Sequence, residues 1–96
     1  MENEVVNKVQ PNDTLAEQAV LGSMLSDKDA VQTALETLKP EDFYREDNKE
    51  IYAAMLELYS VGKHIDMITV IDELKLRGSL EKVGDMQYIS TLIDNV

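Results

Sequence analysis

The clearest helical pattern of the chain lies between Asp47 and Val61, in the residues Asp-Asn-Lys-Glu-Ile-Tyr-Ala-Ala-Met-Leu-Glu-Leu-Tyr-Ser-Val. Its large apolar and aromatic residues recur at helical spacing, at Ile51, Tyr52, Met55, Leu58 and Tyr59. Residues three or four positions apart lie on one face of an α-helix. Gly62 follows directly, at a position where helices commonly end. The stretch therefore predicts an amphipathic helix of about four turns that packs one face into a core.

The first of two preceding segments predicts a helix over residues 15–25. Thr14 and Glu17 have the spacing of a capping box, in which each side chain satisfies a backbone N–H at the helix start. The apolar stripe of this helix consists of Val20, Leu21, Met24 and Leu25. Gly22 lies beside the stripe, where it would let another helix approach closely.

The second preceding segment has Ser26 and Asp27 as candidate N-caps and runs until Pro40, which cannot continue a helix. Its apolar positions are Ala30, Val31, Ala34, Leu35 and Leu38. The connection that follows contains Phe43, the one phenylalanine of the chain. We expect Phe43 to fill the core there.

Two more helices are predicted after the central one. Asp66 is the N-cap of a helix that runs to Arg77 and ends at Gly78. We expect this helix to bury Ile68, Ile71 and Leu74. After a turn at residues 79–84, a fifth helix covers residues 85–95, with a stripe of Met86, Ile89, Leu92 and Ile93. The sequence thus predicts an all-α fold, a compact array of about five short-to-medium helices.

Length and composition support one domain. The chain has 96 residues, of which 44% are hydrophobic, and this is sufficient for a single small core. Residues 1–12 show no periodicity and are expected to form a flexible tail, whereas residues 13–96 form the helical domain. The beginning of the chain is acidic, and no run approaches the about 20 apolar residues of a membrane span. With no cysteine for disulfides, we expect a cytoplasmic protein without a membrane partner.

The charge argues against direct contact with nucleic acid. Nineteen acidic residues against nine basic ones give a net charge of −10, which repels phosphate backbones. The lysines and arginines are spread along the whole sequence rather than gathered in one segment. A solvated acidic surface is the simplest interpretation, and complementarity to a basic partner is the alternative.

No motif for catalysis is present. The Gly62-Lys63 pair is followed by His64 and lacks the first glycine of a phosphate-binding loop. His64 is the only histidine, so no pair of histidines can bind a metal, and it is expected to be a polar turn residue. No serine or threonine has a base placed for nucleophilic catalysis. We therefore expect no catalytic, cofactor-binding or metal-binding residues, and a binding module instead of an enzyme.

Tyr88 is the candidate partner-binding residue. In the fifth predicted helix it lies about 100° from Ile89, at the border of the apolar stripe. A tyrosine at such a border can present its ring edge and hydroxyl group to a partner. It can equally close the rim of the domain's own core, and the sequence does not distinguish the two.

Five segments, in this order and spacing, resemble the N-terminal domain of the bacterial replicative DNA helicase of the DnaB family. They are Ala16-Glu-Gln-Ala-Val-Leu-Gly22, Glu41-Asp-Phe-Tyr44, Ile51-Tyr-Ala-Ala-Met55, Ile65-Asp-Met-Ile-Thr-Val70 and Val83-Gly-Asp-Met-Gln-Tyr-Ile89. The resemblance covers the chain from about Pro11 to Val96. Each segment alone is weak evidence for the family, but their combination in this order is specific.

The resemblance implies a collar domain in a hexameric ring, which self-associates and is contacted by primase and by a helicase loader. The parent protein would be an ATP-dependent helicase whose ATP and magnesium ion bind a C-terminal ATPase domain absent from this chain. A helical hairpin that pairs protomers and carries much of the primase contact is also absent. Tyr88 matches the tyrosine of a family segment near the primase-facing surface.

Three positions depart from the family pattern. His64 stands where the family often has proline, Asp85 where it often has a second glycine, and Leu15 where it often has an acid. Other interpretations stay open beside the helicase collar. One is a free-standing acidic helical adaptor or regulator, and a related one is the helicase-binding domain of a primase.

Overall fold

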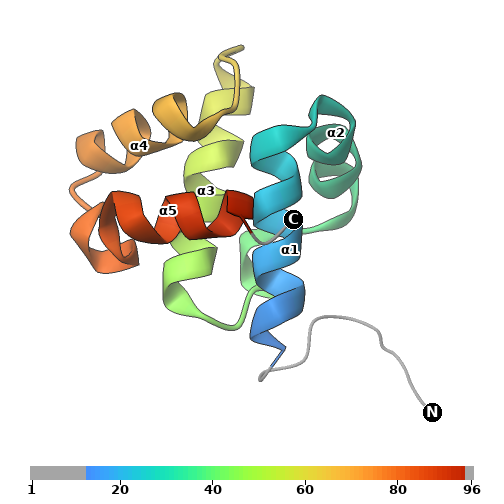
Figure 1. Cartoon of the computed structure of the whole chain (residues 1–96). Coiled ribbons are helices and arrows are strands. Elements are labelled where there is room, and N and C mark those ends of the chain that lie inside the picture. Colours follow the sequence, from blue (N-terminus) through green and yellow to red (C-terminus); the bar gives the residue numbers. More distant parts are fainter. Residues whose placement is uncertain (1–12, 95–96) are drawn as a thin grey trace.

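The structure, a computed structural model, describes residues 13–94 and consists of five α-helices and two short 3₁₀ helices within that range (Figure 1). The α-helices are α1 (Thr14–Ser26), α2 (Lys28–Thr37), α3 (Glu46–Ser60), α4 (Met67–Leu76) and α5 (Asp85–Asp94). The 3₁₀ helices are η1 (Pro40–Asp42) and η2 (Glu81–Val83). No strand occurs between residues 13 and 94, and the predicted all-α fold of about five helices is confirmed. The predicted tail at residues 1–12 lies outside the described residues.

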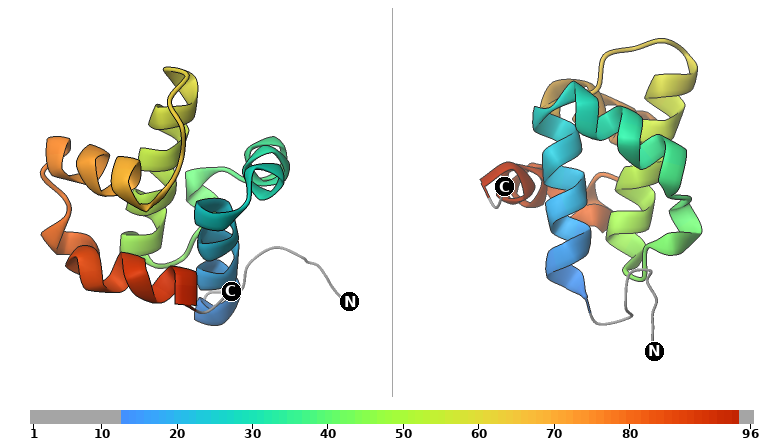
Figure 2. Two further views of the ribbon diagram at one scale, coloured as in Figure 1. Left: turned by 45° about the horizontal axis from the view of Figure 1, so that its top comes forward. Right: turned by 90° about the vertical axis from the view of Figure 1, so that its right-hand side faces the viewer.

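The helices pack as two neighbouring pairs joined by the last helix. Helices α1 and α3 stand side by side, α2 packs on α1, and α4 packs on α3. Helix α5 runs across this arrangement and contacts both α1 and α4 (Figure 2). The end of the described chain therefore returns to α1, the helix with which it begins.

Among the described helices, α3 contributes the most residues to the core, as its periodicity predicts. Ile51, Tyr52 and Met55 are fully buried. The Phe43 ring lies with its centroid 4.9 Å from that of Tyr52, and Phe43 is buried as predicted. The Tyr52 hydroxyl donates to the backbone carbonyls of Ala34 and Leu38 at the end of α2, 3.1 and 2.9 Å away. Burial raises the pKa of Tyr52. Its hydroxyl group stabilises the packing of the end of α2 on α3, because it donates to carbonyl groups at the helix end.

The helix starts agree with the sequence except at α1. Asp27 and Asp66 cap α2 and α4 as predicted, each accepting a hydrogen bond from a backbone N–H of the first turn. The capping box predicted from Thr14 and Glu17 is wrong. Asp13 is the N-cap of α1, and its carboxylate accepts from the backbone N–H of Ala16, 3.2 Å away. Because Asp13 supplies the capping oxygen, Thr14 becomes the first helical residue, and the Glu17 side chain is left for another role.

Three residues assigned to apolar stripes are exposed instead. Ile68 is 72% exposed, Met86 51% and Tyr59 48%. Helix α4 buries Val70, Ile71 and Leu74. On a helical wheel Ile68 points about 110° away from the mean direction of those three, so α4 cannot bury it with them. Its wrong assignment arose because the sequence spacing permits more than one stripe.

The α4–α5 connection requires a glycine at one position. Gly84 has φ +94°, and a Cβ atom placed there would lie 2.7 Å from Cβ of Tyr88. The following residue, Asp85, also has a positive φ, of 64°. Glycine at position 84 thus lets α5 begin with Tyr88 held against the turn. Over residues 13–94, no helix combines the length and apolar character needed to cross a membrane.

Candidate interaction surface

A buried carboxylate lies where α1 faces the beginning of α3. Glu17 is 1% exposed, although it is charged and sits on a surface helix. Its carboxylate accepts hydrogen bonds from the backbone N–H groups of Tyr44 and Arg45, 2.6 and 3.4 Å away, and from Nδ2 of Asn48, 2.8 Å away. Buried carboxylates persist when they are hydrogen-bonded in this way. Glu17 therefore fixes the path of the chain into α3.

Tyr88 continues this hydrogen-bond network onto α5. Its hydroxyl donates to Oδ1 of Asn48 over 2.6 Å and accepts from Nε2 of Gln18 over 3.2 Å. Asn48 is fully buried, and its amide thus joins the Glu17 carboxylate to the Tyr88 hydroxyl. Together Glu17, Gln18, Asn48 and Tyr88 form a polar network that ties α1, α3 and α5 together.

A cation lies over the ring of Tyr88. The guanidinium carbon of Arg45 is 5.9 Å from the ring centroid, within the range of a cation–π contact. Arg45 is also paired with Asp47, with Nη2 2.6 Å from Oδ2, and this hydrogen bond raises the pKa of Arg45. Burial raises the pKa of Tyr88, while the hydrogen bond from Gln18 opposes that shift. The hydroxyl therefore stays protonated, as its donation to Asn48 requires.

The structure shows one of the two roles that the sequence left open for Tyr88. It is partly buried and packs against the core, so it closes the rim of the domain. Exposed apolar side chains lie on the neighbouring segments: Leu15, 76% exposed, one helical turn before Gln18, and Tyr44, 62% exposed, next to Arg45. We call Leu15, Tyr44, Arg45 and Tyr88 the Tyr88 surface. Its role in binding a partner stays a prediction.

Sequence reasoning missed three members of the network. Glu17 was assigned to a helix cap, and neither Gln18 nor Asn48 was singled out. The available signal was Glu17 itself, whose position at the start of α1 permits both a cap and a contact with another helix. Only the packing of α1 against α3 decides between them.

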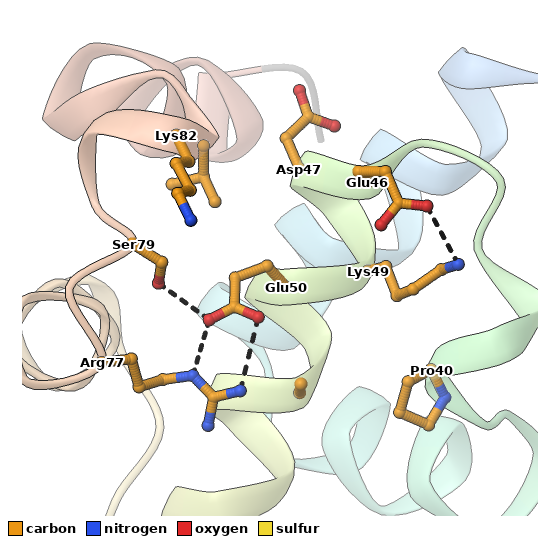
Figure 3. A pocket seen from close by; sticks show the side chains of 10 residues that line it. Pro40, Glu46, Asp47, Lys49, Glu50, Arg77, Ser79 and Lys82 are labelled. Carbon is orange, nitrogen blue, oxygen red and sulfur yellow. Dashed lines mark hydrogen bonds and ion pairs between the residues drawn. The ribbon is translucent and has the colours of Figure 1, made fainter.

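A charged pocket occurs on the other side of α3, and its charges are largely paired with each other (Figure 3). It encloses about 490 Å³ and lies between α3, the end of α4 and η2. The Glu50 carboxylate accepts from Nε of Arg77, 2.7 Å away, and from the Ser79 hydroxyl, 2.8 Å away. Lys49 pairs with Glu46, 3.2 Å away. The hydrogen bond from Arg77 lowers the pKa of Glu50, so the pair stays charged at neutral pH. These contacts connect α3 to the α4–α5 connection.

His64 lies in the α3–α4 connection, with an exposed side chain whose Nε2 is 3.7 Å from Oδ2 of Asp66. Within residues 13–94, no group of three or more histidines, cysteines or carboxylates is arranged to hold a metal ion.

Comparison with known proteins identifies the family. A family model described as the DnaB-like helicase N terminal domain matches residues 9–96. The chain belongs to this family. The DnaB-like fold is also seen in a crystal structure of the N-terminal domain of DnaB helicase from Mycobacterium tuberculosis, with a TM-score of 0.86 and 48% sequence identity. That match covers 90% of this chain and 60% of the other.

Replicative DNA helicases named DnaB are similar over almost the whole chain. The relative from Mycobacterium leprae (strain TN) is 46% identical over 86 residues, which is 90% of this chain and 14% of the relative. The relative from Geobacillus stearothermophilus is 42% identical over 89 residues, which is 93% of this chain and 20% of the relative. The chain thus spans a fifth or less of these DnaB helicases. The resemblance drawn from the five sequence segments is confirmed.

Proposed function

We propose that this chain is the non-catalytic collar domain of a cytoplasmic replicative DNA helicase. In this role it helps to organise the hexamer and recruits primase and a helicase loader. The match of the DnaB-family model to residues 9–96 carries the proposal, because it spans nearly the whole chain. ATP and magnesium would bind a separate C-terminal domain of the parent helicase, and this domain would not contact DNA directly.

The Tyr88 surface is the part of the domain that we assign to partner binding. Interface anchors are often aromatic or arginine side chains held rigidly and surrounded by apolar groups. Tyr88 meets this description because the bonds to Asn48 and Gln18 fix its hydroxyl, and Arg45 lies over its ring. Leu15 and Tyr44 add exposed apolar area on the segments that carry Gln18 and Arg45.

The proposal is tested by measuring the affinity of the chain for the helicase-binding domain of a cognate primase. Leu15→Ala combined with Tyr44→Ala removes apolar contact area without touching the buried network. We expect this double variant to weaken binding by roughly tenfold, with unchanged thermal stability. The matched control combines Ile68→Ala with Leu76→Ala, which removes two exposed aliphatic side chains from α4. If the control weakens binding and the first variant does not, partner binding occurs on another face.

A further inference from the structure

A second pocket lies at the opposite end of the α1–α3 pair from the Tyr88 surface. It encloses about 240 Å³ between the first turn of α2 and the connection from α3 to α4. In Figure 1 both segments lie at the top, where α1 ends and α2 begins. Tyr59, which lines the pocket, follows Asn48 by eleven positions on α3, or about 16 Å along the helix axis. The two surfaces are therefore separate.

The charge of this pocket is opposite to that of the chain. Its lining includes Lys28, Lys63 and His64 and contains no carboxylate, although acidic residues outnumber lysine and arginine by 19 to 9 in the sequence. Asp66 lies outside the lining, with its Oδ2 atom 3.7 Å from Nε2 of His64. The fold thus gathers basic groups from two segments more than thirty positions apart around one pocket whose lining residues include no acid.

Helix stability does not explain the lysine at position 28. Lys28 is the first residue of α2, where the helix dipole disfavours a positive charge. Asp27 and Asp29 flank it, and the carboxylate of Asp27, the N-cap, accepts a hydrogen bond from the backbone N–H of Asp29, 2.9 Å away. A neutral or acidic residue would suit the helix better than Lys28. The positive charge is therefore available for a ligand.

The base of the pocket is apolar. Val31 and Ile65 are both 8% exposed and contribute the apolar part of the lining. The Tyr59 ring is 48% exposed, and its hydroxyl donates to Oε1 of Gln32, 3.3 Å away, which holds the ring beside α2. An apolar base with an aromatic wall and a basic rim fits one bulky apolar side chain with acidic groups around it.

We propose that this pocket binds an acidic peptide segment of a partner protein, with carboxylates flanking one aromatic or large aliphatic side chain. Charge complementarity selects the peptide: the carboxylates would meet Lys28 and Lys63, and the apolar side chain would rest on Val31 and Ile65. A nucleic acid carries a continuous line of phosphates that would extend beyond the pocket over a chain with a net charge of −10, whereas a short acidic peptide places its charges only at the pocket. A small inorganic anion would leave the apolar base unused. The inference does not depend on recruitment of primase.

The experiment measures fluorescence anisotropy of a labelled peptide, Asp-Asp-Phe-Asp-Asp, titrated with the chain. Lys28→Glu combined with Lys63→Glu is expected to weaken binding by roughly tenfold, because two attractive pairs become repulsive. The control, Lys75→Glu combined with Lys82→Glu, changes the net charge equally at exposed lysines outside the pocket. A peptide with glycine in place of phenylalanine, and the variant Tyr59→Ala, are both expected to bind several-fold more weakly than the original pair.

The outcomes separate the possibilities. Loss of affinity in the pocket variant but not in the control, with dependence on the phenylalanine, supports the proposal. An equal loss of affinity in both double variants would mean that long-range charge alone drives binding, and this result overturns the proposal. Equal affinity for the phenylalanine and glycine peptides overturns the proposal, because it would mean that the pocket binds anions in general. It is also overturned if no binding occurs at roughly millimolar protein, or if single-stranded DNA binds the pocket more tightly than the peptide. Thermal unfolding of each variant verifies that the fold is intact.

Discussion

The hydroxyl of Tyr88 donates to the side-chain oxygen of Asn48 over 2.6 Å, joining two residues 40 positions apart in sequence. Asn48 in turn donates from Nδ2 to the buried Glu17 carboxylate. The last helix of the described chain is thus connected to the first through one buried amide. This connection positions Tyr88 and, with it, the surface that we assign to partner binding.

Removing the Tyr88 hydroxyl should destabilise the domain. Tyr88→Phe leaves Oδ1 of Asn48 and Nε2 of Gln18 without this partner, and we expect the free energy of unfolding to fall by about 1–2 kcal/mol. Urea denaturation measures the change. Tyr59→Phe is the control, since its hydroxyl bonds to Gln32 at an exposed position, and it should cost less than about 0.5 kcal/mol. Equal effects of the two substitutions would show that the network contributes nothing.

Glu17→Ala should be among the most destabilising single substitutions. It leaves the backbone N–H groups of Tyr44 and Arg45 and the Asn48 amide without their acceptor in a buried site. We expect a loss of about 3 kcal/mol, measured by chemical denaturation. Glu36→Ala, which removes an exposed carboxylate from a helix, should change stability by about 0.5 kcal/mol or less. A small effect at Glu17 would mean that its carboxylate is a solvated surface group.

Gly84→Ala should be more costly than the same change at Gly62. Both glycines have a positive φ, but a Cβ at Gly84 would lie 2.7 Å from Cβ of Tyr88, whereas nothing lies within 4 Å at Gly62. The Gly62 variant should lose about 1 kcal/mol from backbone strain alone. The free energy of unfolding of the Gly84 variant should fall by about 1–3 kcal/mol more, because α5 must shift to avoid the contact. The thermal unfolding temperatures of the two variants give the comparison, and a reversed order would refute the close approach.

The Glu50–Arg77 contact should make stability depend on acidic pH. The pKa of Glu50 is lowered in the folded state from its ordinary value of 4.5, mainly by the hydrogen bond from Arg77. The stabilisation is therefore complete above the unfolded pKa and is lost as the pH falls through the lower folded pKa. Wild type should be more stable than Glu50→Gln at pH 7, and the difference should shrink as the pH falls below about 4.5. Thermal unfolding of both proteins at several pH values tests this, and a constant difference would contradict it.

The sequence predicted the helices well because their determinants are local. The α3 stripe, the caps at Asp27 and Asp66 and the positive φ at Gly62 and Gly78 follow from residues within one or two turns of each other. Such signals do not depend on how the helices pack.

Features that depend on packing were predicted less well. Ile68 satisfies a helical spacing but is exposed, because the neighbours of α4 cover a different face. Glu17 has the spacing of a cap, yet its partners lie 27 to 31 positions away. Tyr88 could be singled out from its border position, whereas its link to Asn48 and Gln18 appears only when α1, α3 and α5 meet. The pocket at Lys28 and Lys63 likewise combines residues from two segments that are far apart in the sequence.

The most direct test of the proposed function is a titration of the isotope-labelled chain with the helicase-binding domain of a cognate primase, followed by NMR. We expect chemical-shift changes concentrated at Leu15, Tyr44, Arg45 and Tyr88, and little change at the exposed Ile68. The absence of any shift at high concentration, or shifts confined to α4, would contradict it.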